Sequence, residues 1–577
     1  MGQIPLELDQ LHTHKLISHL DYYFARSVAD VHGVSHEWSR ISLALASMGL
    51  AQGDICLDLD RMAGSRLAAP DSPEIFATLP EKSQWLSHLQ ADAMVSGGDA
   101  HGAGQGITPL VLDDNGHLFL ARYHDFQMRL VANLSQRFQR RSLCPDAEFT
   151  TAQVNAAFDG QNPDHVRFQK DAVEKALAHD FVIISGGPGT GKTHITNVMK
   201  KILRQWGRDQ GLSELRILSL APTGKAASRL KDGRTIHSAL GPKWDGPGFV
   251  HGTDYPLAVD LVIVDEASMI DLALMTRLLE AIPVTAKVIL LGDAHQLSPV
   301  QAGTVFCELC RLPGLEFCTA FLAHNFRSHG REGIAALARA VKQGEARQAE
   351  EILTGNAYPD LEFVDTSQTP ADTAMQRLIY EGYKDFMESP DVETALGRMD
   401  GFRILCAHND GPEGRLPINH LCESILHSRG DFDINVSILS RMIIIGSNDY
   451  KRGVFNGDTG VVYREGGMLK AAFPGESSED RKVFRHVDLP AHDTAYAMTI
   501  HKSQGSEFDT VLIRLPETPS RALTRELLYT GITRAKDRVI VVGRPEVVRE
   551  AVSLSQELTG TVGAALEERL RCHETID

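Results

Sequence analysis

The sequence predicts an α/β protein in which two parallel sheets form two lobes with a shared cleft. First, short apolar runs repeatedly end in a polar or glycine-rich cluster, as in FVIISGGPGTGKT, RILSLAPTGKAAS, LVIVDEAS and KVILLGDAHQL. Such runs are typical of strands that are buried on both faces of a parallel sheet. Second, a further set of runs, FRILCAHN, TVLIRL and RVIVVG, follows much later in the chain. Ligands of parallel sheets bind beyond the carboxyl ends of the strands, which is where the polar clusters lie.

The same pattern divides the chain into domains. Residues 1–145 show mostly helical apolar spacing, and near their end PLVLDDNGHLFLARY alternates like two strands around an Asn-Gly turn. We therefore expect a helical N-terminal domain, a first lobe over 146–320 and a second lobe over 321–577. Between about 410 and 495, short strands and turns such as MIIIGSNDY and GVFNGDTGVVYREGGMLKAAF predict a small β-barrel inserted in the second lobe.

Composition excludes several classes of protein. The chain has 577 residues, of which 43% are hydrophobic and 23% charged, as in ordinary globular proteins. Its formal net charge of -17 argues against a protein that coats nucleic acid, although it permits a narrow basic groove in an acidic body. No apolar stretch reaches the roughly 20 residues of a membrane helix, and the opening MGQIPLELDQ lacks the features of a signal peptide. We expect a cytoplasmic protein that does not associate with membranes.

The cysteines point to the same compartment. Eight cysteines are scattered along the chain, and free thiols in a reducing environment are the expected state. Cys307 and Cys310 have C-x-x-C spacing, but no second pair or histidine set completes a zinc site. We interpret them as a core-facing pair on a helix.

The strongest motif is GGPGTGKT, which fits G-x-x-x-x-G-K-[ST] between an apolar run and a predicted helix. That context predicts a P-loop, in which backbone N–H groups wrap the phosphates of ATP. Lys192 is expected to pair with the β and γ phosphates, and the Thr193 hydroxyl to hold Mg²⁺. The expected ATP-binding residues of this segment are Gly186, Gly187, Pro188, Gly189, Thr190, Gly191, Lys192, Thr193 and His194.

Later segments carry the other parts that phosphoryl transfer needs. In LVIVDEAS, Asp265 is the expected second Mg²⁺ ligand, and Glu266 can take a proton from the attacking water. Gln296 in GDAHQ can hydrogen-bond the γ phosphate of ATP, so its contacts would change when that phosphate is lost. Arg327 in HNFRS and Arg534 in YTGITRAKDR can supply transition-state charge, although a lone arginine is more often a surface ion-pair residue.

The ordered motifs resemble a known family. GGPGTGKT, APTGKAASRL, DEAS, GDAHQLSPVQAG, NFRS, YAMTIHKSQGSEFD and LLYTGITRAKDRV resemble the motifs of superfamily 1 DNA helicases, nearest to the RecD-type, 5′ to 3′ branch. This resemblance covers about 168–544. More loosely, DYYFARSVAD and the pair PLVLD and LFLARY resemble the alpha subunits of exodeoxyribonuclease V, which work with RecB and RecC. The resemblance implies two RecA-like P-loop motor domains and an SH3-like fold for the inserted barrel.

The resemblance also assigns residues by motif. It implies that Gln169 reads the adenine, that Phe326 lies against it, and that Gln504 and Glu507 close over the nucleotide from the second lobe. Gln169 could instead be a plain polar helix residue, and each of the DNA-contacting residues named next could be a structural turn or cap residue. The segments that match DNA-contacting motifs contribute Pro222, Thr223, His237, Thr499, His501 and Lys502. These would touch single-stranded DNA chiefly through backbone groups and hydroxyls, which suits an acidic chain.

The implied function is an ATP-dependent 5′ to 3′ DNA helicase that uses ATP and Mg²⁺. It would act as the alpha subunit of a heterotrimer with RecB-like and RecC-like subunits, at DNA duplex ends, in double-strand break repair and homologous recombination. Residues 1–145 would be the docking domain, and no nuclease centre is recognised in this chain. Two alternatives stay open: a stand-alone superfamily 1 helicase, and an interaction subunit that binds nucleotide as a switch without translocating.

Overall fold

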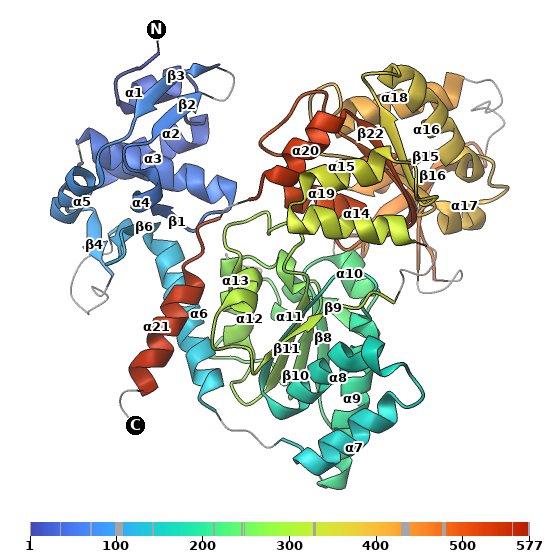
Figure 1. Cartoon of the computed structure of the whole chain (residues 1–577), viewed down its shortest axis with the longest axis horizontal. Coiled ribbons are helices and arrows are strands. Elements are labelled where there is room, and N and C mark those ends of the chain that lie inside the picture. The colour runs from blue at the N-terminus through green and yellow to red at the C-terminus, as the bar shows by residue number, and fades with distance from the viewer. Residues whose placement is uncertain are drawn as a thin grey trace.

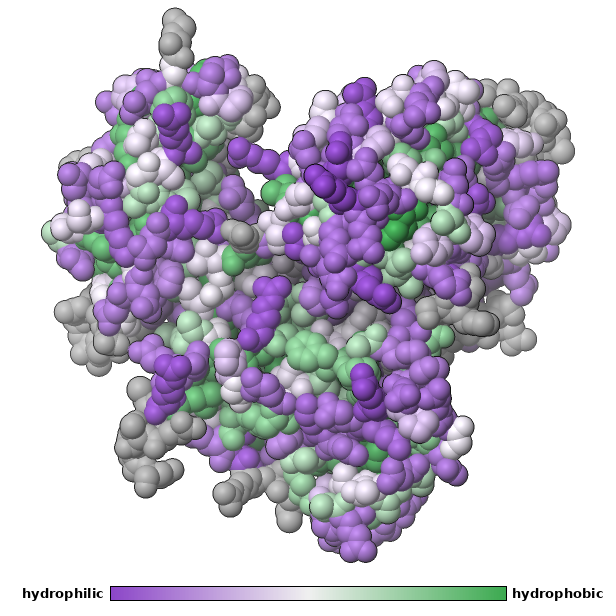
Figure 2. Space-filling model, viewed as in Figure 1, coloured by the Kyte–Doolittle hydropathy of each residue, from purple (hydrophilic) through white to green (hydrophobic). Residues whose placement is uncertain are grey.

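The computed structural model of the chain contains three bodies, each with its own β-sheet or sheets (Figure 1). The N-terminal domain lies at the upper left, the second lobe at the upper right, and the first lobe below both. An open notch separates the N-terminal domain from the second lobe at the top of the same view, and side chains do not fill it (Figure 2). The structure describes residues 2–34, 36–69, 72–98, 108–140, 144–211, 214–243, 246, 248–326, 331–428, 439–449, 451–475, 480–556 and 558–574.

The N-terminal domain combines helices with two small sheets. Its helices are α1 (Leu8–Thr13), α2 (His19–Val31), α3 (Glu37–Gln52), α4 (Leu59–Met62), α5 (Lys82–Ala91) and α6 (Ala121–Phe138). Its strands are β1 (Cys56–Asp58), β2 (Arg66–Ala69), β3 (Ser72–Thr78), β4 (Val95–Gly97), β5 (Leu110–Leu112) and β6 (His117–Leu120). The predicted hairpin is present as the antiparallel pair of β5 and β6. The domain is therefore mixed α/β, and the prediction of a helical domain was wrong. The sequence did not reveal most of the strands, because they are too short to show an alternating pattern.

The first lobe has a six-stranded sheet in the order β12-β7-β11-β10-β8-β9. All its strand pairs are parallel. The strands are β7 (Phe181–Gly186), β8 (Ile217–Ala221), β9 (Gly233–Thr235), β10 (Leu261–Val264), β11 (Lys287–Gly292) and β12 (Thr319–Leu322). The helical segments are α7 (Ala147–Ala157), α8 (Pro163–Ala178), α9 (Lys192–Asp209), α10 (Gly224–Ser228), α11 (Ile236–Leu240), η1 (Ala267–Met269), α12 (Leu272–Ala281) and α13 (Val305–Arg311).

The second lobe has a five-stranded parallel sheet in the order β13-β22-β21-β14-β20. Its strands are β13 (Leu361–Asp365), β14 (Phe402–Cys406), β20 (Ala497–Thr499), β21 (Phe508–Arg514) and β22 (Ala535–Gly543). Its helical segments are α14 (Glu332–Gln343), α15 (Ala346–Thr354), α16 (Ala371–Met387), α17 (Val392–Arg398), α18 (Arg415–Ser428), η3 (His501–Ser503), α19 (Arg525–Ile532) and α20 (Pro545–Ser553). The domain boundary predicted at 320 falls inside β12, which belongs to the first sheet.

A five-stranded antiparallel sheet is inserted between α18 and β20. Its order is β18-β17-β16-β15-β19, and we call it the inserted sheet. Its elements are β15 (Leu439–Ile445), β16 (Thr459–Glu465), β17 (Met468–Phe473), β18 (Lys482–Arg485), η2 (His486–Asp488) and β19 (His492–Thr494). The insertion predicted over 410–495 therefore begins later, because residues 415–428 form α18, which packs on α16 and β20 of the second lobe.

Both faces of the first sheet are buried, as its apolar runs predict. Phe181 and Ile183 of β7 point to one face, and Val182 and Ile184 to the other. The first of these faces is covered in part by α6 and by the C-terminal helix α21 (Val562–Glu574), which lie side by side in Figure 1. The sequence did not indicate that the last helix of the N-terminal domain and the C-terminal helix meet on the first lobe.

A buried arginine ties α6 to the first lobe. Arg137 is 3% exposed, and its guanidinium donates hydrogen bonds to the carbonyl oxygens of Leu279 (3.1 Å), Ile282 (2.6 Å), Pro283 (3.3 Å) and Ala286 (3.3 Å). These carbonyls belong to the end of α12 and the turn after it, where a helix leaves acceptors without partners. The N-terminal domain is thus anchored to the first lobe through a polar contact as well as an apolar one.

The structure also shows where the C-x-x-C pair lies. Cys307 and Cys310 are buried on α13, as expected for a core-facing pair. In the part of the chain that the structure describes, no group of three or more potential metal-ligating side chains occurs. No described helix combines the length and the apolar character that a membrane crossing requires.

Candidate functional site

The P-loop connects β7 to α9 at the carboxyl edge of the first sheet. Gly189 and Gly191 adopt positive φ angles of 80° and 88°, which residues with a side chain rarely take. Gly191 has no room for a larger side chain, because a Cβ atom there would lie 2.1 Å from Nε2 of Gln169. Gln169 in turn donates a hydrogen bond from Nε2 to the carbonyl oxygen of Thr190 (3.0 Å). Gln169, which was expected to contact the adenine, therefore packs against the P-loop and stabilises its backbone.

Lys192 is the first residue of α9 and lies on the inner side of the loop. Its Nζ donates to the carbonyl oxygens of Gly186 (2.6 Å) and Gly187 (3.3 Å). The backbone N–H of Phe326 donates to the carbonyl oxygen of Gly189 (3.0 Å), so the segment after β12 closes one side of the loop. His194 points elsewhere, since its ring lies against Phe158 at a centroid distance of 5.8 Å.

The acidic pair follows β10, at the same edge of the sheet. Asp265 accepts a hydrogen bond at Oδ1 from the backbone N–H of Glu266 (2.9 Å). Glu266 has a φ of 52°, a left-handed conformation that costs a non-glycine residue about 1–3 kcal/mol and is concentrated at functional sites. Burial, followed by repulsion from Asp265, raises the pKa of the Glu266 carboxyl above its ordinary value. Glu266 thus has a carboxylate whose proton affinity is increased.

Gln296 lies after β11 and makes contact with the second lobe through a shared partner. Its Nε2 donates to Oδ2 of Asp293 (3.4 Å), and the hydroxyl of Tyr529 in α19 donates to the same oxygen (3.0 Å). The Oε1 atom of Gln296 is buried and has no hydrogen-bond partner among the described residues. Such an orphaned acceptor at the cleft is suited to a donor on a ligand.

The second lobe contributes Arg534, which precedes β22. It is 2% exposed, and its guanidinium donates to the carbonyl oxygens of Thr530 (3.2 Å) and Ser506 (3.2 Å). Two further contacts join the lobes at Leu297: its N–H donates to Oγ1 of Thr530 (2.9 Å), and its carbonyl accepts from Nε2 of Gln504 (3.2 Å). Gln504 was expected at the nucleotide, but the structure places it in this contact between the lobes.

These side chains surround one cleft of about 460 Å³ between the lobes. Its lining combines the P-loop, both carboxylates and residues of the second lobe: Gly187, Pro188, Gly189, Gly191, Lys192, Thr193, Ala226, Arg229, Leu230, Asp265, Glu266, Gln296, Phe326, Gly505, Glu507 and Arg534. Arg327, the other expected arginine, lies outside the described residues. Thr193 and Asp265 both line the cleft, and both side chains carry oxygen atoms, the donor type that Mg²⁺ requires.

Sequence reasoning missed Arg229 and Tyr529 at this site. Arg229 lines the cleft from the end of α10, and its only sequence signal was its place at the end of APTGKAASRL. Tyr529 is 6% exposed and bonds Asp293 across the lobes. It lies within LLYTGITRAKDRV, but nothing in the spacing of that segment distinguishes it from a core aromatic residue.

The residues expected to contact DNA lie at loop and helix starts in both lobes. Thr223 is the N-cap of α10, where its Oγ1 accepts from the N–H of Ala226 (3.2 Å), directly after Pro222. His237 lies on α11, and burial lowers the pKa of its imidazole. In the second lobe, Thr499 ends β20 and its Oγ1 accepts from the N–H of Lys502 (3.3 Å). Lys502 and its neighbour His501 are exposed on η3.

Comparison with known proteins identifies the family. Three family models match: an AAA domain over 169–302, a UvrD-like helicase C-terminal domain over 494–542, and the RecBCD enzyme subunit RecD N-terminal domain over 13–118. RecBCD enzyme subunit RecD of Mycolicibacterium smegmatis is 32% identical over 92% of this chain and 93% of that protein. The chain belongs to the RecD family.

The chain is also similar to a second curated protein and to a solved structure. The ATP-dependent RecD2 DNA helicase of Deinococcus radiodurans is 31% identical over 70% of this chain but only 52% of its own length. A crystal structure of Pif1 helicase from Bacteroides in complex with ADP-AlF3 and ssDNA aligns over 75% of this chain and 98% of that chain, with a TM-score of 0.37 and 17% identity. The RecD match extends further along this chain than the RecD2 match and includes the N-terminal domain.

Proposed function

We propose that the chain is an ATP-dependent 5′ to 3′ DNA helicase that works in the cytoplasm as the alpha subunit of a RecBCD-type exodeoxyribonuclease V. Its role would be in double-strand break repair and homologous recombination. The observation that supports the motor is that Lys192, Glu266 and Gln296 of the first lobe share one cleft with Glu507 and Arg534 of the second. Membership of the RecD family supports the polarity and the complex.

The chemistry of the cleft follows from the residue types. The P-loop amides and Lys192 would hold the β and γ phosphates of ATP, and Thr193 and Asp265 would hold Mg²⁺, which supplies charge neutralisation when bound. Glu266 would accept a proton from the attacking water, for which its increased proton affinity is suited. Arg534 and Arg327 would stabilise the charge that develops on the γ phosphate.

Coupling between hydrolysis and movement would use the contacts between the lobes. Gln296 and Tyr529 both bond Asp293. Gln296, whose Oε1 lacks a partner among the described residues, is therefore connected through Asp293 to Tyr529 in α19 of the second lobe. Loss of the γ phosphate would change the contacts of Gln296 and Arg534 together, and the lobes would alternate their grip on the single strand. Gln169 and Phe326 would contact the adenine, since Gln169 bonds the carbonyl oxygen of Thr190 and the N–H of Phe326 bonds that of Gly189 in the P-loop.

The proposal includes the finer assignment of domains. We assign the two lobes to the RecA-like class and the inserted sheet to the SH3-like class. We assign residues 1–145 to docking on RecB-like and RecC-like subunits. The anchoring of α6 by Arg137 supports this role, because a load on the N-terminal domain would be transmitted directly to the first lobe.

Unwinding by the purified full chain tests the motor. Duplexes that carry a 5′ or a 3′ single-stranded tail are incubated with ATP and Mg²⁺, and strand separation is measured beside DNA-stimulated ATP hydrolysis. We expect unwinding from the 5′ tail alone. Unwinding from the 3′ tail alone would contradict the polarity. Slow hydrolysis that ignores DNA would instead favour a nucleotide switch without translocation.

Assembly tests the partner assignment. The full chain is mixed with RecB-like and RecC-like subunits from the same organism and analysed by size-exclusion chromatography with light scattering. We expect a heterotrimer, and DNA unwinding by the mixture that exceeds unwinding by the chain alone. Elution of the chain as a free, fully active monomer in the presence of both subunits would support a stand-alone helicase.

A further inference from the structure

Two loops of the second lobe meet at the carboxyl edge of its sheet. β14 and β20 are parallel neighbours in which Cys406 pairs with Thr499, and the N–H of Ile500 donates to the carbonyl oxygen of Cys406 (3.0 Å). The loop after β14 leads to Arg415, and the turn after β20 carries Lys502. The carboxyl edge between neighbouring parallel strands is where ligands of such sheets bind.

Arg415 is buried at this edge without a full set of partners. It is 5% exposed, and its Nε donates to Oδ1 of Asn409 (2.7 Å). Its Nη1 lies 3.2 Å from Oδ2 of Asp493, but it has no hydrogen-bond partner of good geometry among the described residues. A buried charged donor that lacks a well-aligned acceptor is costly and rare, so it points to a ligand that supplies one.

Lys502 adds a second positive charge at this edge, in the turn after β20, the strand on which α18, with its first residue Arg415, packs. Partial burial lowers the pKa of the Lys502 ammonium, and the charge of Arg415 lowers it further. Asp493 acts in the opposite direction, but its side chain is 48% exposed. In a chain of net charge -17, two cations at one edge of the sheet, of which one is buried and paired only with a half-exposed carboxylate, form an arrangement that an anion would stabilise.

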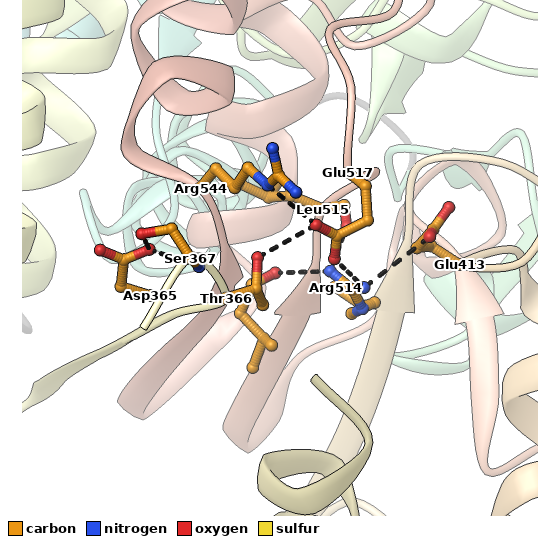
Figure 3. Close-up of polar contacts among 9 residues, drawn as sticks. Asp365, Thr366, Ser367, Glu413, Arg514, Leu515, Glu517 and Arg544 are labelled. Atoms are coloured by element: carbon orange, nitrogen blue, oxygen red, sulfur yellow. Dashed lines mark hydrogen bonds and ion pairs between the residues drawn. The ribbon is translucent and has the colours of Figure 1, made fainter. Parts of the chain in front are cut away.

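The loop that carries Arg415 is held in place by the network in Figure 3. There Arg514, at the end of β21, lies 3.9 Å from Glu413 and 2.6 Å from Glu517, which Arg544 also contacts (3.1 Å). The backbone N–H of Arg415 donates to the carbonyl oxygen of His408 (3.0 Å). The backbone from which the Arg415 side chain extends is therefore held in place before any ligand binds.

An asparagine of α18 attaches this helix to β20. Asn419 is 4% exposed and pairs with both backbone groups of Ala497: its Nδ2 donates to the carbonyl oxygen and its Oδ1 accepts from the N–H, each at 2.8 Å. β20 is an edge strand, so these bonds replace the missing neighbour on its free side. The turn with Lys502 is thereby held against the helix that begins with Arg415.

We infer that Arg415 and Lys502 together bind one phosphate of the single strand that the second lobe grips. Asp493 is the resident counter-ion of Arg415, which the phosphate would displace or share. The inference rests on the proposed function and adds Arg415 to the residues that contact DNA. It assigns to the second lobe a backbone contact that positions the strand without reading its bases.

A purely structural role for Arg415 predicts a different outcome. Asp493 lies in β19, so the ion pair could serve only to attach the inserted sheet to α18. That attachment is already made nearby, because Oγ1 of Thr494 donates to Oε1 of Glu423 in α18 (2.7 Å). If the ion pair were an attachment, removing either partner would have the same effect. If Arg415 binds phosphate, removing Asp493 frees it and the two substitutions have opposite effects.

Binding of a fluorescein-labelled oligothymidylate of about 15 nucleotides to the full chain, measured over a range of KCl concentrations, separates these roles. We expect Arg415→Gln to weaken binding about tenfold at low salt, the loss of one charge-assisted contact. The slope of log K against log salt should fall by about 0.7, the value for one phosphate of a single strand. Asp493→Asn should tighten binding several-fold. Arg549→Gln, which removes an arginine paired with Glu350 on another face (3.1 Å), is the matched control.

Each outcome decides a separate point. Failure of the unsubstituted chain to bind the oligonucleotide would overturn the proposed function itself. Normal binding by Arg415→Gln, or weaker binding by both Arg415→Gln and Asp493→Asn, would overturn the phosphate site alone. Thermal unfolding is measured for every variant. Where Arg415→Gln does not fold, the sign of the Asp493→Asn effect decides: tighter binding supports the site, and weaker or unchanged binding overturns it.

Discussion

Replacing Lys192 by alanine is expected to lower the rate of ATP hydrolysis by about 100- to 1,000-fold or more, the loss typical of a single group that stabilises transition-state charge. The reason is that Lys192 is the one ammonium group on the inner side of the P-loop among the residues that line the described cleft. DNA unwinding should be lost with it. The measurement is steady-state ATP turnover with and without single-stranded DNA.

A matched substitution tests whether the effect is local. Lys170→Ala removes the same side chain from α8, where Lys170 is half-buried and bonds only Oδ1 of Asn155 (3.0 Å) among the contacts described. It should hydrolyse ATP at the normal rate. Hydrolysis by Lys192→Ala within a few-fold of the unsubstituted chain would contradict the assignment of the site, provided that both variants unfold at the normal temperature.

Glu266→Gln is expected to retain ATP binding while the turnover number falls by about 100- to 10,000-fold, the usual contribution of a general base. The substitution keeps the size of the side chain but removes its ability to accept a proton. Nucleotide affinity, measured with a fluorescent ATP analogue, should change little because the P-loop is intact. Turnover of Glu351→Gln, an exposed glutamate of α15, should be normal.

The pH dependence of turnover gives a second measure of the same residue. Burial and the charge of Asp265 raise the pKa of Glu266, so the carboxylate is lost at a higher pH than that of an ordinary glutamate. Because the deprotonated form is the active base, turnover should fall on acidification through this raised pKa. A turnover number that stays constant down to the ordinary range of glutamate would show that Glu266 is not the base.

Much of the cleft could be predicted because its parts are local. A glycine-rich turn after a buried strand and a carboxylate pair at a strand end are encoded by neighbouring residues, and parallel pairing brings strand ends to one edge. Lys192, Asp265, Glu266 and Gln296 lie at that edge for this reason. The burial of the strands on both faces was readable from their continuous apolar runs.

Other features could not be predicted, since they depend on contacts between distant segments. The short strands of the N-terminal domain have no alternating pattern, and α18 carries no sequence signal that separates it from the insertion that follows. Gln504 matches a nucleotide-closing motif, but its side chain reaches Leu297 of the other lobe instead. The direction of a long polar side chain is decided by packing, which the motif does not contain.

By itself, then, the sequence determined the two parallel-sheet lobes, the P-loop and the chemical groups of the cleft, because glycine conformation and strand-end polarity act within a few residues. Only the tertiary structure decided that Tyr529 and Gln296 share Asp293, that α6 and α21 cover the first sheet together, and that α18, which begins with Arg415, packs on β20, which leads to Lys502. These contacts join residues far apart in the chain. Their energy depends on burial and geometry, which exist only once the lobes have folded and packed.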